Sequence, residues 1–216
     1  TTKDIAFRKK NLLKLKNVLK DNESLLFEAI YKDFRKSEFD TFANELNLVY
    51  HEIDYLLKNI NRLSKPQKVK TGIALFPGKS YIYSEPLGCT LIIGAWNYPY
   101  SLTLIPLVSS MAAGNTSIIK PSELPANAMH AIAELINTNF PSEYLYVVEG
   151  GIPETTELLK LPYDKIFFTG SPRVGRIVYE AAAKNLTPVT LELGGKSPEI
   201  VTDSADLEVA VRRIIW

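Results

Sequence analysis

Short apolar segments with the character of β-strands alternate with helical segments from Gly88 to the end of the chain. Strands separated by single helices pair in parallel, and the connecting helices cover the sheet. The sequence therefore predicts an α/β fold with a parallel sheet and helices on both faces. The predicted strands span 90–94, 116–120, 145–148, 165–169 and 189–193, and the predicted helices span 102–113, 126–140, 154–160 and 173–184.

A helical segment precedes this alternation. In residues 4–63, apolar side chains recur every three or four positions, which is the spacing of a helix face that packs on a core. We therefore predict antiparallel helices packed on the body of the protein. A long apolar seam can also serve a dimer, but core packing is the plainer interpretation. The three runs are Leu12, Leu15 and Leu19; Leu26, Ile30 and Phe34; and Phe42, Leu46, Val49, Ile53, Leu56 and Ile60.

A ribbon links the helices to the sheet. Lys65 and Pro66 end the third helix, because proline lacks the N–H that a helix interior needs. Residues 69–86 then alternate like extended strands, with residues 76–79 as their turn. An exposed ribbon can pair with a neighbouring subunit, so it is a possible oligomerisation element of a homodimer. The chain thus divides into an N-terminal helical segment (1–65), an extended β ribbon (66–86) and a sheet domain (87–216).

Composition narrows the classes of function. The single cysteine, Cys89, has no partner for an internal disulfide, and His51 and His130 lie far apart outside any metal-binding spacing. Residues 1–70 carry 15 basic and 10 acidic side chains, and the formal net charge of the whole chain is +1. An asymmetry in charge this mild is typical of a solvated surface, so we expect no nucleic-acid partner. The pattern of cysteine and histidine residues leads us to expect no metal.

The chain shows no targeting or membrane-spanning segment, so we expect a cytoplasmic protein with no membrane contact from this part. It begins with Thr1 rather than Met, and Arg212 to Trp216 lie in a periodic helical stretch that has no cap. We therefore expect the sequence to be part of a longer polypeptide.

In parallel sheets, ligands collect at the carboxyl ends of the strands. After the first predicted strand, residues 94–99 contain Asn97. An asparagine held at a strand end can aim an amide N–H at an oxygen that gains negative charge during a reaction. An Asx turn before Pro99 also explains this residue, and from this stretch alone it is the favoured interpretation.

The second predicted strand ends at Lys120, and Glu123 follows three residues later. An ammonium group that donates and a carboxylate that accepts hydrogen bonds can together bind the hydroxyls of a ribose. The carboxylate also opposes an extra phosphate on that ribose, which favours NAD over NADP. A surface ion pair that leads into a helix is an equally good interpretation without further support.

The fourth predicted strand leads to Gly170, Ser171 and, after Pro172, Gly175. The two glycines have the spacing of the outer pair in a dinucleotide-binding fingerprint, but Pro172 occupies the position of the middle glycine and has no N–H for a phosphate. Pro172 fits better as the first residue of a helix that Ser171 caps. The amino end of this helix can still face an anionic ligand.

The fifth predicted strand ends in Glu192, followed by Leu193, Gly194 and Gly195. A glutamate beside two glycines can move, and a mobile carboxylate can activate a water molecule. A satisfied strand-end glutamate is the commoner outcome. Cys89 precedes the first strand, where a lone cysteine is usually a small buried side chain, so we do not assign it as a nucleophile.

Together and in this order, these segments resemble the aldehyde dehydrogenase superfamily. Residues 150–159 and 186–190 are similar to its class 3, fatty-aldehyde branch in particular. The likeness covers essentially the whole chain and implies a Rossmann-like cofactor domain that is incomplete at its carboxyl end, as in the amino-terminal half of such an enzyme. The motifs are Trp96-Asn97-Tyr98-Pro99, Lys120-Pro121-Ser122-Glu123, Phe168-Thr169-Gly170-Ser171, Gly175 and Glu192-Leu193-Gly194-Gly195-Lys196-Ser197-Pro198.

The resemblance implies NAD- or NADP-dependent oxidation of an aldehyde to a carboxylic acid through a cysteine thioester. In the family's scheme, Asn97 donates to the oxyanion and Glu192 activates water. The implied cofactor-binding residues are Trp96, Lys120, Glu123, Gly170, Ser171, Gly175, Leu193 and Gly194. The family's nucleophilic cysteine lies beyond the end of this chain, so we expect residues 1–216 alone to be inactive.

Two other classes of function stay open. The first is a non-catalytic, half-length module that binds nucleotide or partner chains. The second keeps the fold but changes the reaction, as in acyl phosphate or acyl-CoA reductases. Glu192 argues against such reductases, because a base that activates water is useful only where water is the acceptor.

Overall fold

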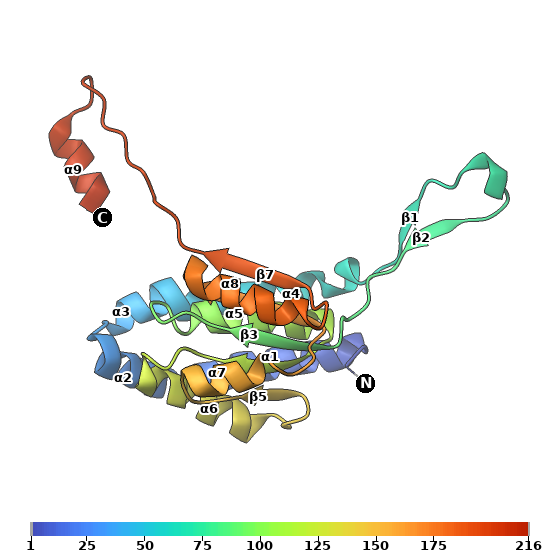
Figure 1. The fold of residues 1–216 in the computed structure, drawn as a ribbon, viewed down its shortest axis with the longest axis horizontal. Coiled ribbons are helices and arrows are strands. Elements are labelled where there is room, and N and C mark those ends of the chain that lie inside the picture. The colour runs from blue at the N-terminus through green and yellow to red at the C-terminus, as the bar shows by residue number, and fades with distance from the viewer. Residues whose placement is uncertain (1, 216) are drawn as a thin grey trace.

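The chain folds around a five-stranded parallel sheet, and the structure, a computed structural model, describes residues 2–215 (Figure 1). Every pairing in this sheet is parallel, and Ile92 in the central strand lies opposite Ile119 on one side and Phe167 on the other. The predicted α/β fold is confirmed. In their spatial order the strands are β5 (Leu145–Val147), β4 (Thr116–Lys120), β3 (Cys89–Ile93), β6 (Lys165–Gly170) and β7 (Val189–Leu193).

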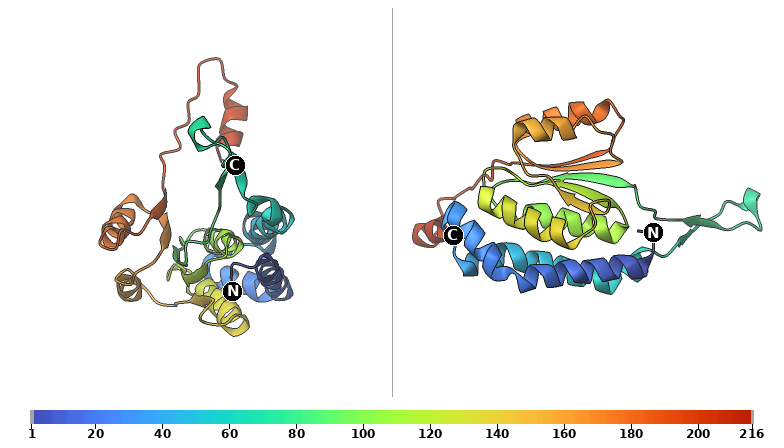
Figure 2. Two further views of the ribbon diagram at one scale, coloured as in Figure 1. Left: turned by 90° about the vertical axis from the view of Figure 1, so that its right-hand side faces the viewer. Right: turned by 90° about the horizontal axis from the view of Figure 1, so that it is seen from below.

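Helices cover both faces of the sheet (Figure 2). One face carries α5 (Ser101–Ala113) and α6 (Ala126–Asn139), and the other carries α7 (Ile152–Leu158) and α8 (Pro172–Ala183). Along β3, Ile92 packs on the side of α5, whereas Leu91 and Ile93 pack on the side of α7 and α8. This is the alternation that a strand buried on both faces requires.

The N-terminal segment adds a second layer of helices outside α5 and α6 (Figure 2). The leucines of the first predicted run and most members of the other two runs are buried, as the helical spacing predicts. Its elements are α1 (Ile5–Asp21), α2 (Glu23–Phe34), α3 (Glu38–Thr41), the π-helical turn η1 (Phe42–Leu46) and α4 (Asn47–Leu63).

Two of the predicted core positions were wrong: Phe34 is 37% exposed and Phe42 is 39% exposed. Phe34 ends α2 and leans on the ring of Trp96, with the ring centroids 6.1 Å apart. Phe42 opens the π turn, which has more residues per turn than an α-helix and therefore shifts the phase of the apolar stripe.

The predicted ribbon is a short antiparallel hairpin that projects from the body of the molecule (Figure 1). Its strands are β1 (Gln67–Val69) and β2 (Ser80–Ile82), and a 3₁₀ turn, η2 (Ile73–Leu75), lies between them. The predicted turn is present in part, because residues 76 and 77 form a turn and Gly78 N donates to Leu75 O at 2.6 Å. The loop is longer than predicted, since the whole stretch 70–79 lies outside the ladder. Local bonds hold this stretch instead, with Leu75 N donating to Gly72 O at 3.0 Å and Phe76 N to Ile73 O at 3.1 Å.

The chain ends in a projecting segment (Figure 1). Residues 194–206 contain neither helix nor strand, and α9 (Leu207–Ile215) follows with no buried side chain. The predicted strands and helices of the sheet domain differ from the observed ones by one or two residues at their ends. Among residues 2–215, no helix combines the length and the apolar character that crossing a bilayer requires.

Candidate active site

The carboxyl ends of β3 and β6 form the switch point of the sheet. These strands are neighbours, and the helices that follow them, α5 and α8, depart to opposite faces. The two loops therefore separate at this point, and a doubly wound sheet binds its ligands in the crevice that such loops leave. Asn97 lies in the loop after β3, and Ser171 lies in the loop after β6.

The loop after β3 presents polar groups to solvent. Trp96 is 52% exposed, Asn97 is exposed beside it, and Pro99 and Tyr100 return to the interior. The ammonium of Lys36 lies over the ring of Tyr98, 4.1 Å from the ring centroid. Asn97 thus lies on a short loop. The residues on either side of it, Trp96 and Tyr98, contact the N-terminal helical segment.

Lys120 ends β4 as a buried cation with 1% of its surface exposed. Its Nζ donates to the carbonyl of Pro121 at 2.6 Å. Burial lowers the pKa of Lys120, and the charges of Glu123 and Glu154 oppose that shift. A β-carbon added to Gly151, which follows β5, would lie 3.7 Å from Cγ of Glu123. The ends of β4 and β5 therefore gather an ammonium group and a carboxylate in one place.

Ser171 caps the helix that follows β6. Its hydroxyl accepts from the backbone N–H of Val174 at 3.3 Å, and Pro172 is the first helical residue. This confirms the predicted start of α8. Because β6 ends at Gly170, the positive amino end of α8 lies at the carboxyl edge of the sheet, where an anionic group is stabilised.

Gly170 and Gly175 allow close packing. A β-carbon on Gly170 would lie 2.6 Å from the ring of Phe168, and one on Gly175 would lie 2.9 Å from Cδ2 of Leu193. Gly175 is buried within α8 and lets that helix approach β7. The structure thus gives both glycines a steric role, and their contact with a cofactor stays a prediction.

Glu192 and Leu193 end β7 beside the loop of Ser171. Glu192 pairs with Thr169, and Leu193 pairs with Gly170. Successive residues of a strand point to opposite faces, so Glu192 points away from α8 because Leu193 packs toward it. Glu192 is exposed, and no atom outside its chain neighbours lies within 4 Å of a β-carbon placed on Gly194.

Two carboxylates near the carboxyl edge of the sheet cannot be recognised as helix caps from the local sequence. Asp33 in α2 accepts from the backbone N–H groups of Asn127 and Ala128, at 3.2 and 2.8 Å, and so caps α6. Glu45 in η1 accepts from the backbone N–H of Tyr100 at 2.8 Å, at the start of α5. Each partner lies more than 50 residues away along the chain, so only the folded arrangement reveals these caps.

Cys89 begins β3 and packs, partly buried, against the core on the α7 and α8 side. It therefore lies at the amino end of the strand, away from Asn97 and Glu192. Across residues 2–215, no group of three or more His, Cys, Asp or Glu side chains is arranged to hold a metal ion.

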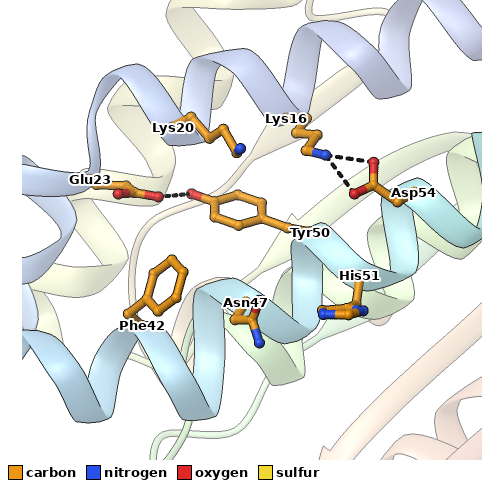
Figure 3. A pocket seen from close by; sticks show the side chains of 8 residues that line it. All are labelled: Lys16, Lys20, Glu23, Phe42, Asn47, Tyr50, His51 and Asp54. Carbon is orange, nitrogen blue, oxygen red and sulfur yellow. Dashed lines mark hydrogen bonds and ion pairs between the residues drawn. The ribbon is translucent and has the colours of Figure 1, made fainter.

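A separate surface pocket of about 470 Å³ lies between α1 and α4 (Figure 3). Its charged groups face one another: Lys16 Nζ lies 2.5 and 2.6 Å from the two carboxylate oxygens of Asp54, and Tyr50 donates to Glu23 at 2.8 Å. Lys20 Nζ lies 5.4 Å from the centroid of the Tyr50 ring. These contacts join the helices to one another, and none of the predicted site residues lines this pocket.

The chain matches the aldehyde dehydrogenase family over residues 2–216. It is 49% identical over 215 residues to the 4,4'-diaponeurosporen-aldehyde dehydrogenase of Staphylococcus aureus, covering 100% of this chain and 47% of that protein. Mouse aldehyde dehydrogenase family 3 member A2 is 46% identical over the same length, which is 44% of that protein. The solved substrate-bound state of Staphylococcus aureus AldH is 49% identical and aligns with a TM-score of 0.96, covering 99% of this chain and 47% of that one.

Two further relatives name a cofactor. The dog "aldehyde dehydrogenase, dimeric NADP-preferring" is 43% identical over 100% of this chain and 48% of that protein. A Mycobacterium tuberculosis aldehyde dehydrogenase solved with NAD⁺ is 30% identical, with a TM-score of 0.80 over 94% of this chain and 42% of that one. The chain spans about half the length of the relatives it matches.

The fold and the site define a class, the doubly wound α/β proteins whose ligand crevice lies at the switch point of the sheet. Within that class, this chain belongs to the aldehyde dehydrogenase family, and its relatives include family 3 members.

Proposed function

We propose that this chain supplies the cofactor-binding half of an NAD(P)-dependent aldehyde dehydrogenase, which oxidises an aldehyde to a carboxylic acid through a cysteine thioester. One observation carries the proposal: in a chain of this family, Asn97, Lys120 and Glu192 follow or end strands at the same edge of one sheet. The nucleophilic cysteine comes from beyond Trp216, since Cys89 begins β3 at the amino end of that sheet.

Asn97 and Glu192 serve two different steps. When the thiolate adds to the aldehyde carbon, the carbonyl electrons move to its oxygen, and the Asn97 amide donates a hydrogen bond to that oxyanion. A bound nicotinamide cofactor would supply the acceptor for the hydride that this carbon loses as the oxyanion collapses to the thioester carbonyl. Glu192 then takes a proton from a water molecule, whose oxygen attacks the thioester carbon. The thiolate leaves, and the carboxylic acid is released.

The residues at the ends of β4 and β5 fit the adenosine ribose of such a cofactor. Lys120 is buried, and its three N–H groups have one acceptor among residues 2–215, the carbonyl of Pro121. A ribose hydroxyl can accept from Lys120 and donate to Glu123. The amino end of α8 with Ser171 suits the pyrophosphate. The remaining cofactor contacts are proposed for Trp96, Gly170, Gly175, Leu193 and Gly194.

The choice between NAD and NADP depends on Glu123. Its carboxylate is exposed near the proposed ribose site and repels an additional phosphate there, which favours NAD. The relatives support each of the two cofactors, because one is named as NADP-preferring and another was solved with NAD⁺. We propose that both cofactors support turnover, with NAD preferred.

Substrate, assembly and location are proposed from the family branch. The proposed substrate is a medium- or long-chain aliphatic aldehyde or an aromatic aldehyde. The names of the family 3 relatives support an aldehyde but do not specify which kind. A homodimer is proposed, in keeping with the dog relative's name, and its contact is the exposed hairpin of β1 and β2. The location proposed is the cytoplasm.

The test of this function is aldehyde-dependent formation of reduced nicotinamide by the full-length protein. A medium-chain aliphatic aldehyde is supplied with NAD and then with NADP. We expect turnover with both cofactors, and we expect none from a polypeptide restricted to residues 1–216. Cofactor binding without aldehyde oxidation would favour a non-catalytic, half-length binding module instead.

A second candidate keeps the sheet and the cysteine but uses an acyl phosphate or acyl-CoA as the oxidised partner. The exposed carboxylate of Glu192 at the end of β7 disfavours this candidate, because it provides a base for water. Phosphate- or CoA-dependent formation of the acyl product in the same assay would favour it.

A further inference from the structure

Glu45 is a fully buried carboxylate that belongs to none of the motifs at the strand ends. Its side chain is 0% exposed, and it lies in η1, the π-helical turn between α3 and α4. Single π turns inside helices are rare and occur often at functional sites. A buried carboxylate is costly unless charged or hydrogen-bonded partners compensate it, so its contacts show what the residue does.

The two oxygens of Glu45 have separate partners. Oε2 accepts from the backbone N–H of Tyr100 at 2.8 Å and from that of Ser101 at 3.3 Å. Oε1 accepts from Nζ of Lys36 at 2.7 Å. The two N–H groups lie at the start of α5, where the partial positive charge of the helix end attracts a carboxylate. Burial raises the pKa of Glu45, while Lys36 and the two amides oppose that shift.

These contacts fix one end of the loop that carries Asn97. At the other end of the loop, Gly94 N donates to the carbonyl of Lys120 at 3.1 Å. Tyr100 is anchored a second time, because its hydroxyl donates to the carbonyl of Leu26 at 2.7 Å. Only five residues, 95–99, lie between Gly94 and Tyr100, so the positions of these two ends limit where the amide of Asn97 can lie.

Lys36 extends the same anchor to the middle of the loop. Its ammonium bonds Glu45 and also lies 4.1 Å from the ring centroid of Tyr98, the residue after Asn97. On the other side of Asn97, Trp96 packs on Phe34. The N-terminal helical segment therefore contacts the residue before Asn97, the residue after it and the end of its loop.

We propose that Glu45, held by Lys36, is a positioning residue that sets the loop of Asn97 so that the Asn97 amide meets the oxyanion. This inference rests on the proposed function, in which Asn97 is the donor. A reacting geometry that is displaced by about 1 Å can cost on the order of 100-fold in rate. Loss of the anchor at Glu45 therefore lowers the rate of the chemical step through Asn97 and leaves the ribose site at Lys120 unaffected.

The experiment is a double-mutant cycle between Glu45 and Asn97 in the full-length protein. Glu45→Gln is made in the unsubstituted protein and in the Asn97→Ala variant, and kcat and the dissociation constant of NAD are measured for all four. We expect Glu45→Gln to lower kcat by roughly 10- to 100-fold in the unsubstituted protein. In the Asn97→Ala background we expect less than about a 2-fold loss, because the group that Glu45 positions is already absent. The dissociation constant of NAD is expected to change far less than kcat, by less than about 3-fold, because Lys120 and Glu123 lie outside the loop and only Trp96 among the proposed cofactor contacts lies on it.

Asp33→Asn is the matched control. Asp33 is a carboxylate of the same N-terminal segment that caps a different helix, α6, through the N–H groups of Asn127 and Ala128. The Asp33→Asn substitution is expected to lower the melting temperature, while kcat at saturating cofactor stays within about 2-fold of the unsubstituted value. If Glu45→Gln does not fold, Lys36→Met serves in the same cycle, because it removes the ion pair that holds Glu45 while the N–H groups of Tyr100 and Ser101 can still donate to the carboxylate.

The outcomes separate this inference from the proposed function. Equal losses of kcat in both backgrounds, or an unchanged kcat in the unsubstituted protein, overturn the positioning role while the dehydrogenase function stands. No turnover by the unsubstituted full-length protein overturns both. A loss confined to the background that contains Asn97 supports both.

Discussion

Lys120 is a charged side chain that the fold buries at a strand end. It ends a buried strand with 1% of its surface exposed, so its charge is held with little help from water. Burial lowers its pKa against the opposing charges of Glu123 and Glu154. A cation kept in this state is poorly solvated, which makes a ligand hydroxyl a favourable partner for it.

The lowered pKa of Lys120 predicts how stability depends on pH. Between the folded-state pKa and the unfolded value of about 10.4, the unfolded chain binds more protons than the folded chain. The free energy of unfolding should therefore rise as pH increases through this window, and Lys120→Met should remove that contribution. Urea unfolding of both proteins at several alkaline pH values measures the difference. Parallel pH profiles for the two proteins would show that the pKa of Lys120 is not lowered in the folded protein.

At the scale of helices and strands, the contact of α8 with β7 links packing to the proposed site. A β-carbon on Gly175 would lie 2.9 Å from Cδ2 of Leu193, an atom at the end of a flexible side chain that is 43% exposed. Alanine within a helix is favoured over glycine by about 1 kcal/mol. The steric conflict therefore displaces Leu193 rather than unfolding the helix.

Gly175→Ala is accordingly expected to keep the unfolding free energy within about 1 kcal/mol of the original value and to weaken cofactor binding. Thermal unfolding and titration of the full-length protein with NAD measure the two quantities. Gly170→Ala is the contrasting variant, because its β-carbon would lie 2.6 Å from the ring of the buried Phe168. A loss of stability by Gly175→Ala as large as that by Gly170→Ala would show that Leu193 does not yield.

The elements that the sequence predicted correctly are those whose signal is local. The strands of the sheet and the capped start of α8 at Ser171 depend on neighbouring residues, and they were predicted to within two residues. Phe34 and Phe42 were misplaced because their partners and the π turn depend on tertiary packing. The caps that Asp33 and Glu45 provide join residues far apart in the chain, so no periodicity could indicate them.

The whole molecule has two projecting parts, the hairpin of β1 and β2 and the helix α9 (Figure 1). The hairpin tip carries Ile73 and Phe76 at 95% and 85% exposure, and α9 has no buried side chain. Apolar side chains as exposed as these are typical of surfaces that contact another part of an assembly.

The double substitution Ile73→Asp and Phe76→Asp is therefore expected to shift the full-length protein from dimer to monomer. Charges at the tip disfavour its burial against a second subunit, and the fold of the body should be unchanged, since neither side chain packs on it. Light scattering coupled to size-exclusion chromatography measures the mass, and circular dichroism checks the fold. A dimer of unchanged affinity would exclude the hairpin tip as the contact.

Pre-steady-state kinetics of the full-length Glu192→Gln variant measure whether Glu192 activates water after the hydride has been transferred. The variant is mixed with NAD and an aldehyde, and reduced nicotinamide is followed from the first turnover. We expect a burst close to one equivalent per active site, followed by steady-state turnover slowed by roughly 100- to 10,000-fold. A variant that shows no burst, or that turns over at the unsubstituted rate, would contradict the role of Glu192.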